Sequence, residues 1–234
     1  MRLARRSAED GFTLVELLWV IGLVSLLVGL VVPGLAKGRA AARGLGCLGN
    51  LRQWGSGTLD YAHDHGDRLP DDGAGNGTSL RDAWYADVPP YLGEAPYARQ
   101  GPWRTNSIGA LPRCVWLCPA NPRRSDGHML FHYCLNRLVN GSGSASQPVV
   151  WSSLQEPSRT VWLFDNGKRA AVATAGNVHP GLHPTGVNML FLDGHATRVP
   201  RKFYWDPVRE RPIMDHPELR WTGRNLPAEP ESPN

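Results

Sequence analysis

The amino-acid sequence predicts an α+β protein in which a long N-terminal transmembrane α-helix packs on an antiparallel β-sheet head with long loops. Three observations support this prediction. An apolar run covers residues 12–32, an Ala-rich and Arg-rich stretch with spaced leucines follows it, and β-branched and aromatic segments bounded by turn residues come late in the chain. The 234 residues leave enough sequence outside the membrane helix to bury a core.

The apolar run from Phe12 to Val32 has the length of one membrane crossing. As a helix its residues span about 30 Å, close to the hydrocarbon thickness of a bilayer. Glu16 is unusual there, because an ionised side chain at bilayer depth costs on the order of 2–3 kcal/mol. If the chain were cut after Gly11, the new cationic amine at Phe12 would lie about 6 Å from Glu16 along the helix axis. We expect this amine, in the same chain or a neighbouring one, to be the partner of Glu16.

The residues GFTLVEL at positions 11–17 carry a resemblance to a known family. This segment resembles the cleavage and methylation motif of type IV prepilins and pseudopilins, in which a prepilin peptidase cuts after the glycine and methylates the new N-terminus. The resemblance implies cleavage between Gly11 and Phe12, N-methylation of Phe12, and a role for Glu16 in assembly. The alternative is an uncleaved anchor or a secretory signal, but a signal peptide would place small residues after its apolar core.

Two further stretches resemble one group of these pilin-like proteins, which is described by its C-terminal H-X9-DG motif. The residues CLGNLRQ at positions 47–53 are similar to its C-x-x-N-L-R-Q stretch. His183 is followed by nine residues and then by Asp193 and Gly194, which is the H-X9-DG spacing. The other residues that fit the longer form of this motif are Gly186, Asn188, Phe191 and His195. The resemblance therefore implies a pilin-like fold.

The net charge of +4 indicates a membrane surface rather than nucleic acid as a partner. The basic excess is concentrated just after the predicted membrane helix, where it suits anionic lipid headgroups. The residues that supply it are Lys37, Arg39, Arg43 and Arg52. Basic residues flank the apolar run on both sides, so the positive-inside count does not orient it. The resemblance implies a single-pass protein of the inner (cytoplasmic) membrane with its head in the periplasm, or in an extracellular filament.

Beyond the membrane run, the helix is expected to bend or break at Pro33-Gly34 and to resume from Leu35 to about His63. Its packing side is predicted to carry Leu45, Leu48, Leu51, Leu59 and Trp54. We divide the chain into a leader (1–11), an N-terminal helix (12–64, membrane part 12–32), a head (65–200) and a Pro-rich tail (201–234). We expect the tail to wrap the surface or stay mobile, with Trp205 and Trp221 docking part of it.

The four cysteines are Cys47, Cys114, Cys118 and Cys134. Disulfides persist in an oxidising compartment, and four cysteines allow three full pairings between which the sequence does not choose. The pattern C-x3-C followed by His128 and His132 also permits a zinc site. Buried thiols are the third alternative. We favour disulfide bonding, because Cys118-Pro119 resembles the Cys-Pro element of the H-X9-DG group.

The late strands are predicted at residues 160–164, 187–192 and 195–199. Asp193-Gly194 between the last two is typical of a tight type I′ hairpin. In the structural interpretation Asp193 accepts backbone N–H groups in the turn, Gly194 supplies a positive φ, and His183 bonds across the loop that enters the strand.

The alternative interpretation of this motif is a metal site. It would bring together His179, His183, Asp193 and His195. Pro180 and Gly181 disfavour the helix that would place the first two histidines on one face. A His and an Asp without a nucleophile are weak evidence for acid–base catalysis. We therefore expect no catalytic residue, no metal and no cofactor.

The resemblance implies a structural subunit, not an enzyme, of a type IV pilus-like or type II secretion pseudopilus-like filament. Its implied partners are prepilin peptidase, copies of itself or other pilin-like subunits, and an inner-membrane assembly platform. The alternatives are a membrane-tethered periplasmic binding module and a metal-binding protein.

Overall fold

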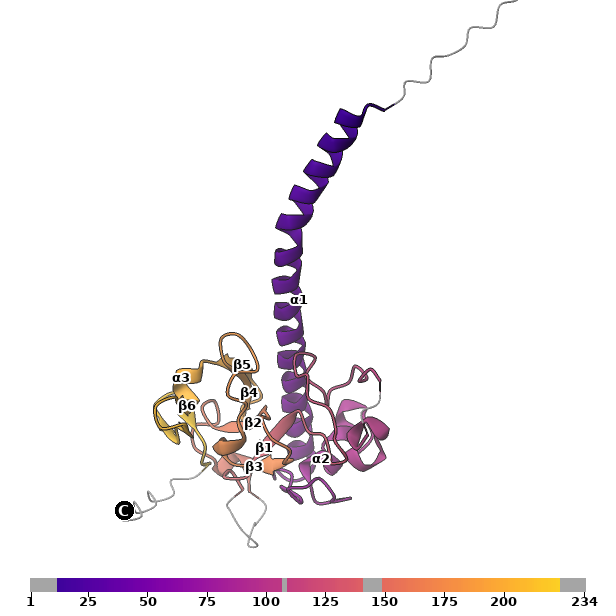
Figure 1. Cartoon of the computed structure of the whole chain (residues 1–234). Helices are drawn as coiled ribbons and strands as arrows, with labels where there is room; N and C mark the ends of the chain where they lie inside the picture. The colour runs from indigo at the N-terminus through magenta and orange to yellow at the C-terminus, as the bar shows by residue number, and fades with distance from the viewer. Residues whose placement is uncertain (1–11, 107–108, 141–148, 224–234) are drawn as a thin grey trace, which may run out of the picture. The chain divides into compact units, whose positions relative to one another are not determined.

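The structure is a computed structural model that describes residues 12–106, 109–140 and 149–223 (Figure 1). The predicted leader, residues 107–108 and 141–148, and the last eleven residues lie outside these ranges. The chain divides into two compact units, Met1–Ala42 and Arg43–Asn234. The predicted α+β class is confirmed, because a long N-terminal helix is followed by a head built on a β-sheet.

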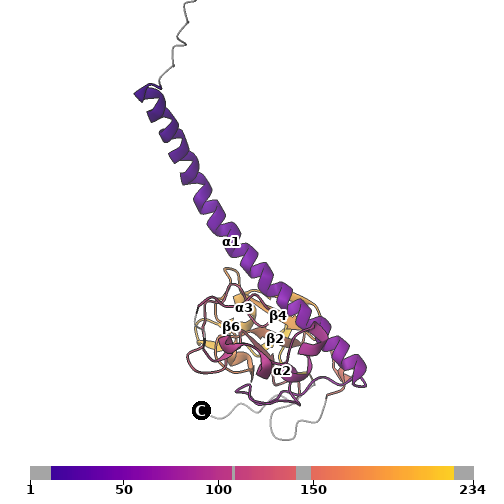
Figure 2. The same ribbon diagram turned by 90° about the vertical axis from the view of Figure 1, so that its right-hand side faces the viewer.

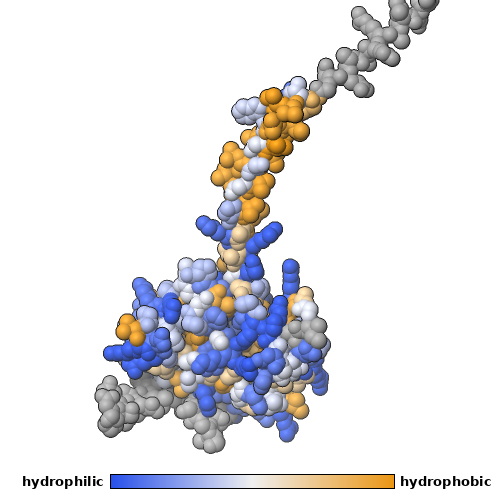
Figure 3. Space-filling view, in the orientation of Figure 1, coloured by the Kyte–Doolittle hydropathy of each residue, from blue (hydrophilic) through white to orange (hydrophobic). Residues whose placement is uncertain are grey.

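Helix α1 (Leu14–Asp64) begins with the apolar run and continues through Pro33 without a break, so the interruption that the sequence allowed at Pro33-Gly34 does not occur. Its large apolar side chains between Phe12 and Val32 are 49 to 77 % exposed. Figure 3 shows them gathered along the first part of the helix. Among the described residues, α1 is the single helix long and apolar enough to cross a membrane, which is compatible with a single-pass anchor.

The last turns of α1 belong to the second unit and pack into its core. The buried face is formed by Cys47, Leu51, Trp54, Thr58 and Ala62, whose spacing of three and four residues makes one stripe of a helix. The predicted face was wrong for Leu45, which is 65 % exposed. Leu45 lies two residues before Cys47, about 200° around the helix, and therefore points away from the core.

The central sheet has five strands in the order β3-β1-β2-β4-β5. Their bounds are β1 Tyr133–Asn136, β2 Val161–Asp165, β3 Val172–Ala173, β4 Val187–Phe191 and β5 Ala196–Val199. All neighbours pair antiparallel except β1 and β3, which are parallel. The sheet is therefore mixed, whereas the sequence predicted an antiparallel one.

Strands β1, β2 and β4 are buried along their whole length because the sheet lies between two apolar cores. On one side Trp162 and Leu190 join the core that contains the buried face of α1. The indole N–H of Trp162 donates to the Thr58 hydroxyl at 3.2 Å. On the other side Phe164 and Met189 form a second core with residues from the tail. Both faces of the sheet are thus covered by chain.

The described part of the tail forms α3 (Arg201–Tyr204) and two small hairpins. The hairpin strands are β6 Trp205–Asp206, β7 Arg211–Pro212, β8 Asp215–His216 and β9 Leu219–Arg220. Trp221 is 1 % exposed and meets Phe164 edge-on, with 5.5 Å between ring centroids. Its carbonyl accepts the Asn136 amide at 2.8 Å. The tail therefore completes the second core, and the prediction that Trp221 docks part of the tail is confirmed.

A long connection leads from α1 to β1, and its described residues are 65–106 and 109–132 (Figure 2). Its aromatic side chains are buried against the end of α1. Trp54 of α1 meets Trp84 and Trp116 edge-on, with centroids 5.1 and 4.8 Å apart, and Tyr97 stacks on Phe131. The short helices of the head are α2 Trp84–Asp87, η1 Pro89–Leu92, η2 Tyr97–Arg99, η3 Pro102–Arg104, η4 Trp151–Ser153 and η5 Ala175–Asn177.

Two leucines of α1 test which face of the helix packs on the head. Leu51→Ala should lower the free energy of unfolding by about 2–5 kcal/mol, because it leaves a cavity in the core. The matched control Leu45→Ala should cost about 0.5 kcal/mol or less, because Leu45 is exposed. Denaturant unfolding of the full chain in detergent, followed by tryptophan fluorescence, measures both. Equal losses would contradict this packing.

Candidate functional site

The predicted cleavage site lies at the edge of the described residues, because Gly11 is outside them and Phe12 is 75 % exposed. Glu16 has a partner within its own chain. Its Oε2 atom accepts the Thr13 backbone N–H at 2.9 Å and the Thr13 hydroxyl at 2.7 Å. The Thr13 hydroxyl in turn accepts the Glu16 N–H at 3.2 Å, which completes a capping box. Sequence reasoning missed this pair, although T-x-x-E before an apolar run is its signature.

The end of the H-X9-DG motif forms the turn between β4 and β5. Phe191 accepts the Gly194 N–H at 3.0 Å and donates its own N–H to His195, so the loop has three residues. Gly194 has φ of 86°, and Asp193 Oδ1 accepts the His195 N–H at 3.1 Å. The predicted type I′ turn was wrong, because it needs positive φ at Asp193 as well, and Asp193 does not have it. A positive φ at the last loop residue alone is typical of a three-residue hairpin.

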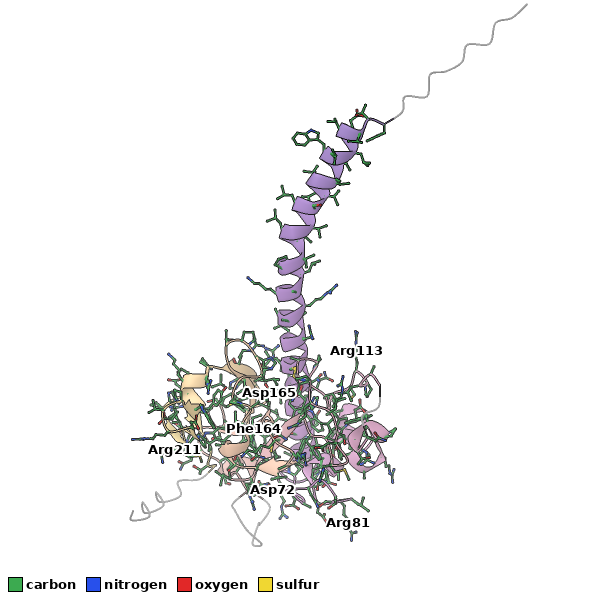
Figure 4. All side chains as sticks on the ribbon, in the orientation of Figure 1. Asp72, Arg81, Arg113, Phe164, Asp165 and Arg211 are labelled. Carbon is green, nitrogen blue, oxygen red and sulfur yellow. A yellow bond between two sulfur atoms is a disulfide. The ribbon has the colours of Figure 1, made fainter. Side chains whose placement is uncertain are left out.

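The histidine that opens the motif lies in a buried polar network at the other end of β4. Asp165 is the last residue of β2 and is fully buried (its position is labelled in Figure 4). His183 is 4 % exposed, and its Nε2 atom lies 3.0 Å from Oδ2 of Asp165. The same oxygen accepts the backbone N–H of Asn188 at 2.7 Å. The Asn188 amide nitrogen Nδ2 lies 2.8 Å from His183 Nε2, and Asn188 Oδ1 accepts the Arg198 Nε–H at 3.2 Å. Nε2 of His183 therefore lies between the Asp165 carboxylate and the Asn188 amide, and Nδ1 is the ring nitrogen nearest to Gly44 of α1.

Both ends of this hairpin rest against α1 at glycines. A Cβ at Gly44 would lie 2.5 Å from Nη2 of Arg198 and 3.4 Å from Nδ1 of His183. A Cβ at Gly55 would lie 2.8 Å from the Gly194 carbonyl oxygen. The two glycines are about 16 Å apart along the helix axis. The motif therefore places a strand of matching length along the helix, with one end of the motif at each contact.

One disulfide joins α1 to the long connection, and the prediction of disulfide bonding holds for this pair. Cys47 and Cys118 are bonded, with their Cα atoms 4.5 Å apart. Cys114 and Cys134 are thiols, so the alternative of unbonded cysteines applies to these two. Burial raises the pKa of both thiols above the ordinary range, which keeps them protonated at neutral pH.

The predicted zinc pattern near Cys118 is not assembled. His132 uses both ring nitrogens inside the fold: Nδ1 accepts the Cys118 N–H at 3.1 Å, and Nε2 lies 3.1 Å from the Arg123 carbonyl. Burial lowers the pKa of His132 to about 4, so the ring is neutral at pH 7. His128 instead lies at the surface, 3.3 Å from Asp126.

The four residues of the alternative metal interpretation do not form one ligand group among the described residues. His183 pairs with Asp165, His195 pairs with Asp193 at 2.6 Å, and Nδ1 of His179 accepts the Gly181 N–H. Within the described ranges, one group of three metal-ligating side chains lies close together, namely Cys47, Cys118 and His183. Its two sulfur atoms are bonded to each other, so it offers no thiolate in this state.

The pairs Asp165–His183 and Asp193–His195 differ in burial, and substituting each aspartate compares how much they stabilise the fold. Asp165→Ala should lower the free energy of unfolding by about 3–5 kcal/mol, because it leaves buried partners unpaired. Asp193→Ala should cost about 1 kcal/mol, because that pair is partly exposed. Denaturant unfolding measures the free energy of unfolding of both variants. Similar losses would contradict a larger stabilising contribution from the buried pair.

His132 predicts a defined pH dependence of stability. Its folded pKa lies below the unfolded value near 6.5, so the unfolded chain binds more protons between about pH 6.5 and 4. Its contribution is complete above pH 6.5 and is lost as the pH falls, by on the order of 3 kcal/mol. The unfolding free energies of wild type and His132→Asn should therefore converge across this window. A constant difference between them would contradict a neutral buried His132.

Comparisons with protein-family models, with curated proteins and with solved structures find no match to this chain. The resemblance to the prepilins therefore rests on its own motifs: GFTLVEL at 11–17, CLGNLRQ at 47–53 and the H-X9-DG spacing from His183.

Proposed function

We propose that this chain is a structural subunit of a type IV pilus-like or type II secretion pseudopilus-like filament. A prepilin peptidase would remove residues 1–11 and methylate Phe12, and the subunit would assemble through α1. The observation that carries this proposal is the exposed apolar surface of α1 directly after the GFTLVEL segment. Lipid covers this surface before assembly, and the helices of neighbouring subunits would cover it in the filament.

The geometry of Glu16 supports a role in assembly beyond its helix cap. Its hydrogen bonds to Thr13 use Oε2, and Oε1 accepts none among the described residues. The carboxylate can therefore keep its cap and also receive the ammonium group of a processed Phe12 from a neighbouring subunit. A charge pair in an apolar layer has strong orientational preference, so it would set the axial stagger between subunits.

The remaining features agree with a subunit held in the inner membrane until it is assembled. Its head would lie in the periplasm, where the Cys47–Cys118 disulfide would persist. Lys37 at the end of the apolar run would meet lipid headgroups. The proposed partners are prepilin peptidase, copies of this chain or other pilin-like subunits, and an assembly platform in the same membrane. The role is structural and not catalytic.

A periplasmic binding module is the second candidate, and one cavity favours it. The cavity has a volume of about 550 Å³ beside the last turns of α1 and is lined by Tyr61, His65, Asp82, Asp87 and Tyr91. Tyr61 and His65 stack, and Tyr91 meets Tyr61 edge-on. Aromatic faces with carboxylates suit a cationic partner. Loss of secreted-protein capture in Tyr91→Ala, with filament assembly unchanged, would favour this role.

Substitutions of Glu16 separate its charge from its helix cap. Glutamine also closes a capping box, so Glu16→Gln should keep the helix start and remove only the charge. We expect this variant to be cleaved normally, as shown by its electrophoretic shift, and to form at least tenfold fewer filaments by immunogold counting. Glu16→Ala should fail equally and also weaken the helix start by about 0.5–2 kcal/mol.

Ser25→Ala is the matched control within the same apolar run, because the Ser25 hydroxyl only donates back to the Ile21 carbonyl at 2.7 Å. It should assemble as the wild type does. Normal filament numbers in Glu16→Gln would refute the charge pairing, independently of the result for Ser25→Ala.

A further inference from the structure

We propose that Cys47, Cys118 and His183 form a binding site for a divalent transition metal such as Zn²⁺ when the Cys47–Cys118 disulfide is reduced. The three ligand atoms lie within 4.8 Å of one another. They come from α1, from the long connection and from the loop before β4, so the fold itself brings them together. This proposal does not depend on filament assembly.

The spacing of the ligands suits a tetrahedral metal. Zinc binds thiolate sulfur at about 2.3 Å and imidazole nitrogen at about 2.0 Å, which places its ligand atoms roughly 3.5–3.8 Å apart. Opening the S–S bond lets the two sulfur atoms move apart to that separation. The side chains of Cys47, Cys118 and His183 are 0, 2 and 4 % exposed, so the ligands are held by surrounding packing.

The network around His183 orients the ring for this role. Asp165 holds Nε2 at 3.0 Å, and Nδ1 lies on the side of α1 that carries Gly44 and Cys47. Nε2 is already in contact with the Asp165 carboxylate and with the Asn188 amide, which leaves Nδ1 for a metal. Asn188 and Arg198 continue the chain of contacts behind it. The ligating nitrogen is therefore Nδ1.

The charge of the site favours the metal only in the reduced state. Two thiolates would carry two negative charges into a buried site, and a divalent cation neutralises both. The disulfide offers no thiolate, so the oxidised head should not bind. A dithiol reductant of the thioredoxin class would supply two electrons and two protons to the S–S bond and become a disulfide itself. Both new thiols would then lose their protons as the metal binds.

The other two cysteines lie outside the site and serve as matched controls. Cys134 belongs to the second core, on the sheet face opposite the core that contains Cys47 and Cys118. Cys114 is partly buried, and within the described residues it is not part of the metal-ligating group.

Cobalt titration of the full chain in detergent tests the site. The protein is reduced without oxygen by a phosphine, which is not a thiol ligand, and Co²⁺ is added. We expect one Co²⁺ per chain, with thiolate charge-transfer and tetrahedral visible absorption, and none before reduction. Cys47→Ser and Cys118→Ser should each remove about half of the charge-transfer intensity. Cys114→Ser and Cys134→Ser should leave it unchanged, and His183→Gln should weaken binding at least about tenfold.

If reduction unfolds the head, circular dichroism of the same samples still tests the site, because it measures whether the metal restores the fold. In that case Zn²⁺ should restore the native spectrum of the reduced wild type but not of Cys47→Ser. A reduced chain that binds no Co²⁺ while folded, or that Zn²⁺ does not refold, would overturn the proposal. Tetrahedral binding that survives Cys47→Ser or His183→Gln unchanged would overturn it as well.

Discussion

The close approach of the β4–β5 hairpin to α1 is the contact on which the structure of the head depends. It needs a residue without a side chain at Gly55, because a Cβ there would lie 2.8 Å from the backbone oxygen of Gly194. At Gly44 the hairpin approaches through the end of the Arg198 side chain. Between these points the stripe of Cys47, Leu51 and Trp54 enters the core. The disulfide from Cys47 ties the same face of the helix to the long connection. The H-X9-DG spacing is therefore explained as the length of a strand laid along a helix.

Much of this arrangement could be predicted from local sequence. The apolar run, the helical character of residues 35–63 and the end of the helix near His63 were visible in composition and periodicity, and α1 ends at Asp64. The continuity of the helix through Pro33 was not expected. The late strands followed from β-branched and aromatic residues beside turn signals, and β2, β4 and β5 lie where they were expected. The capping box of Thr13 and Glu16 could have been found too, since its four-residue pattern is local.

The rest depended on contacts between distant residues. Asp165 reads as a turn residue after a strand, and nothing near it in sequence shows that it holds His183, eighteen positions away. The parallel pairing of the two-residue strand β3 with β1 also has no local signal. The choice of Cys47 and Cys118 among three pairings, and the exposure of Leu45, follow from how the helix rotates onto the sheet. Periodicity identifies a helix more surely than it identifies the buried face.

The capping box gives Glu16 a hydrogen-bonding partner within its own chain. Oε2 of Glu16 accepts two hydrogen bonds from Thr13, so this acid is partly satisfied within its own chain and its presence alone does not demonstrate a partner amine. The proposal rests instead on the whole GFTLVEL segment and on the apolar surface that follows it. The proposed assembly requires that residues 1–11 be removed first, so the N-terminus of the mature chain is the decisive feature of the proposal.

The most direct test is the N-terminal sequence and intact mass of the protein purified from membranes of cells that contain a prepilin peptidase. Our account predicts a chain that begins at Phe12 and carries one added methyl group on its terminal amine. A membrane-bound chain that begins at Met1, without that methyl group, would contradict it.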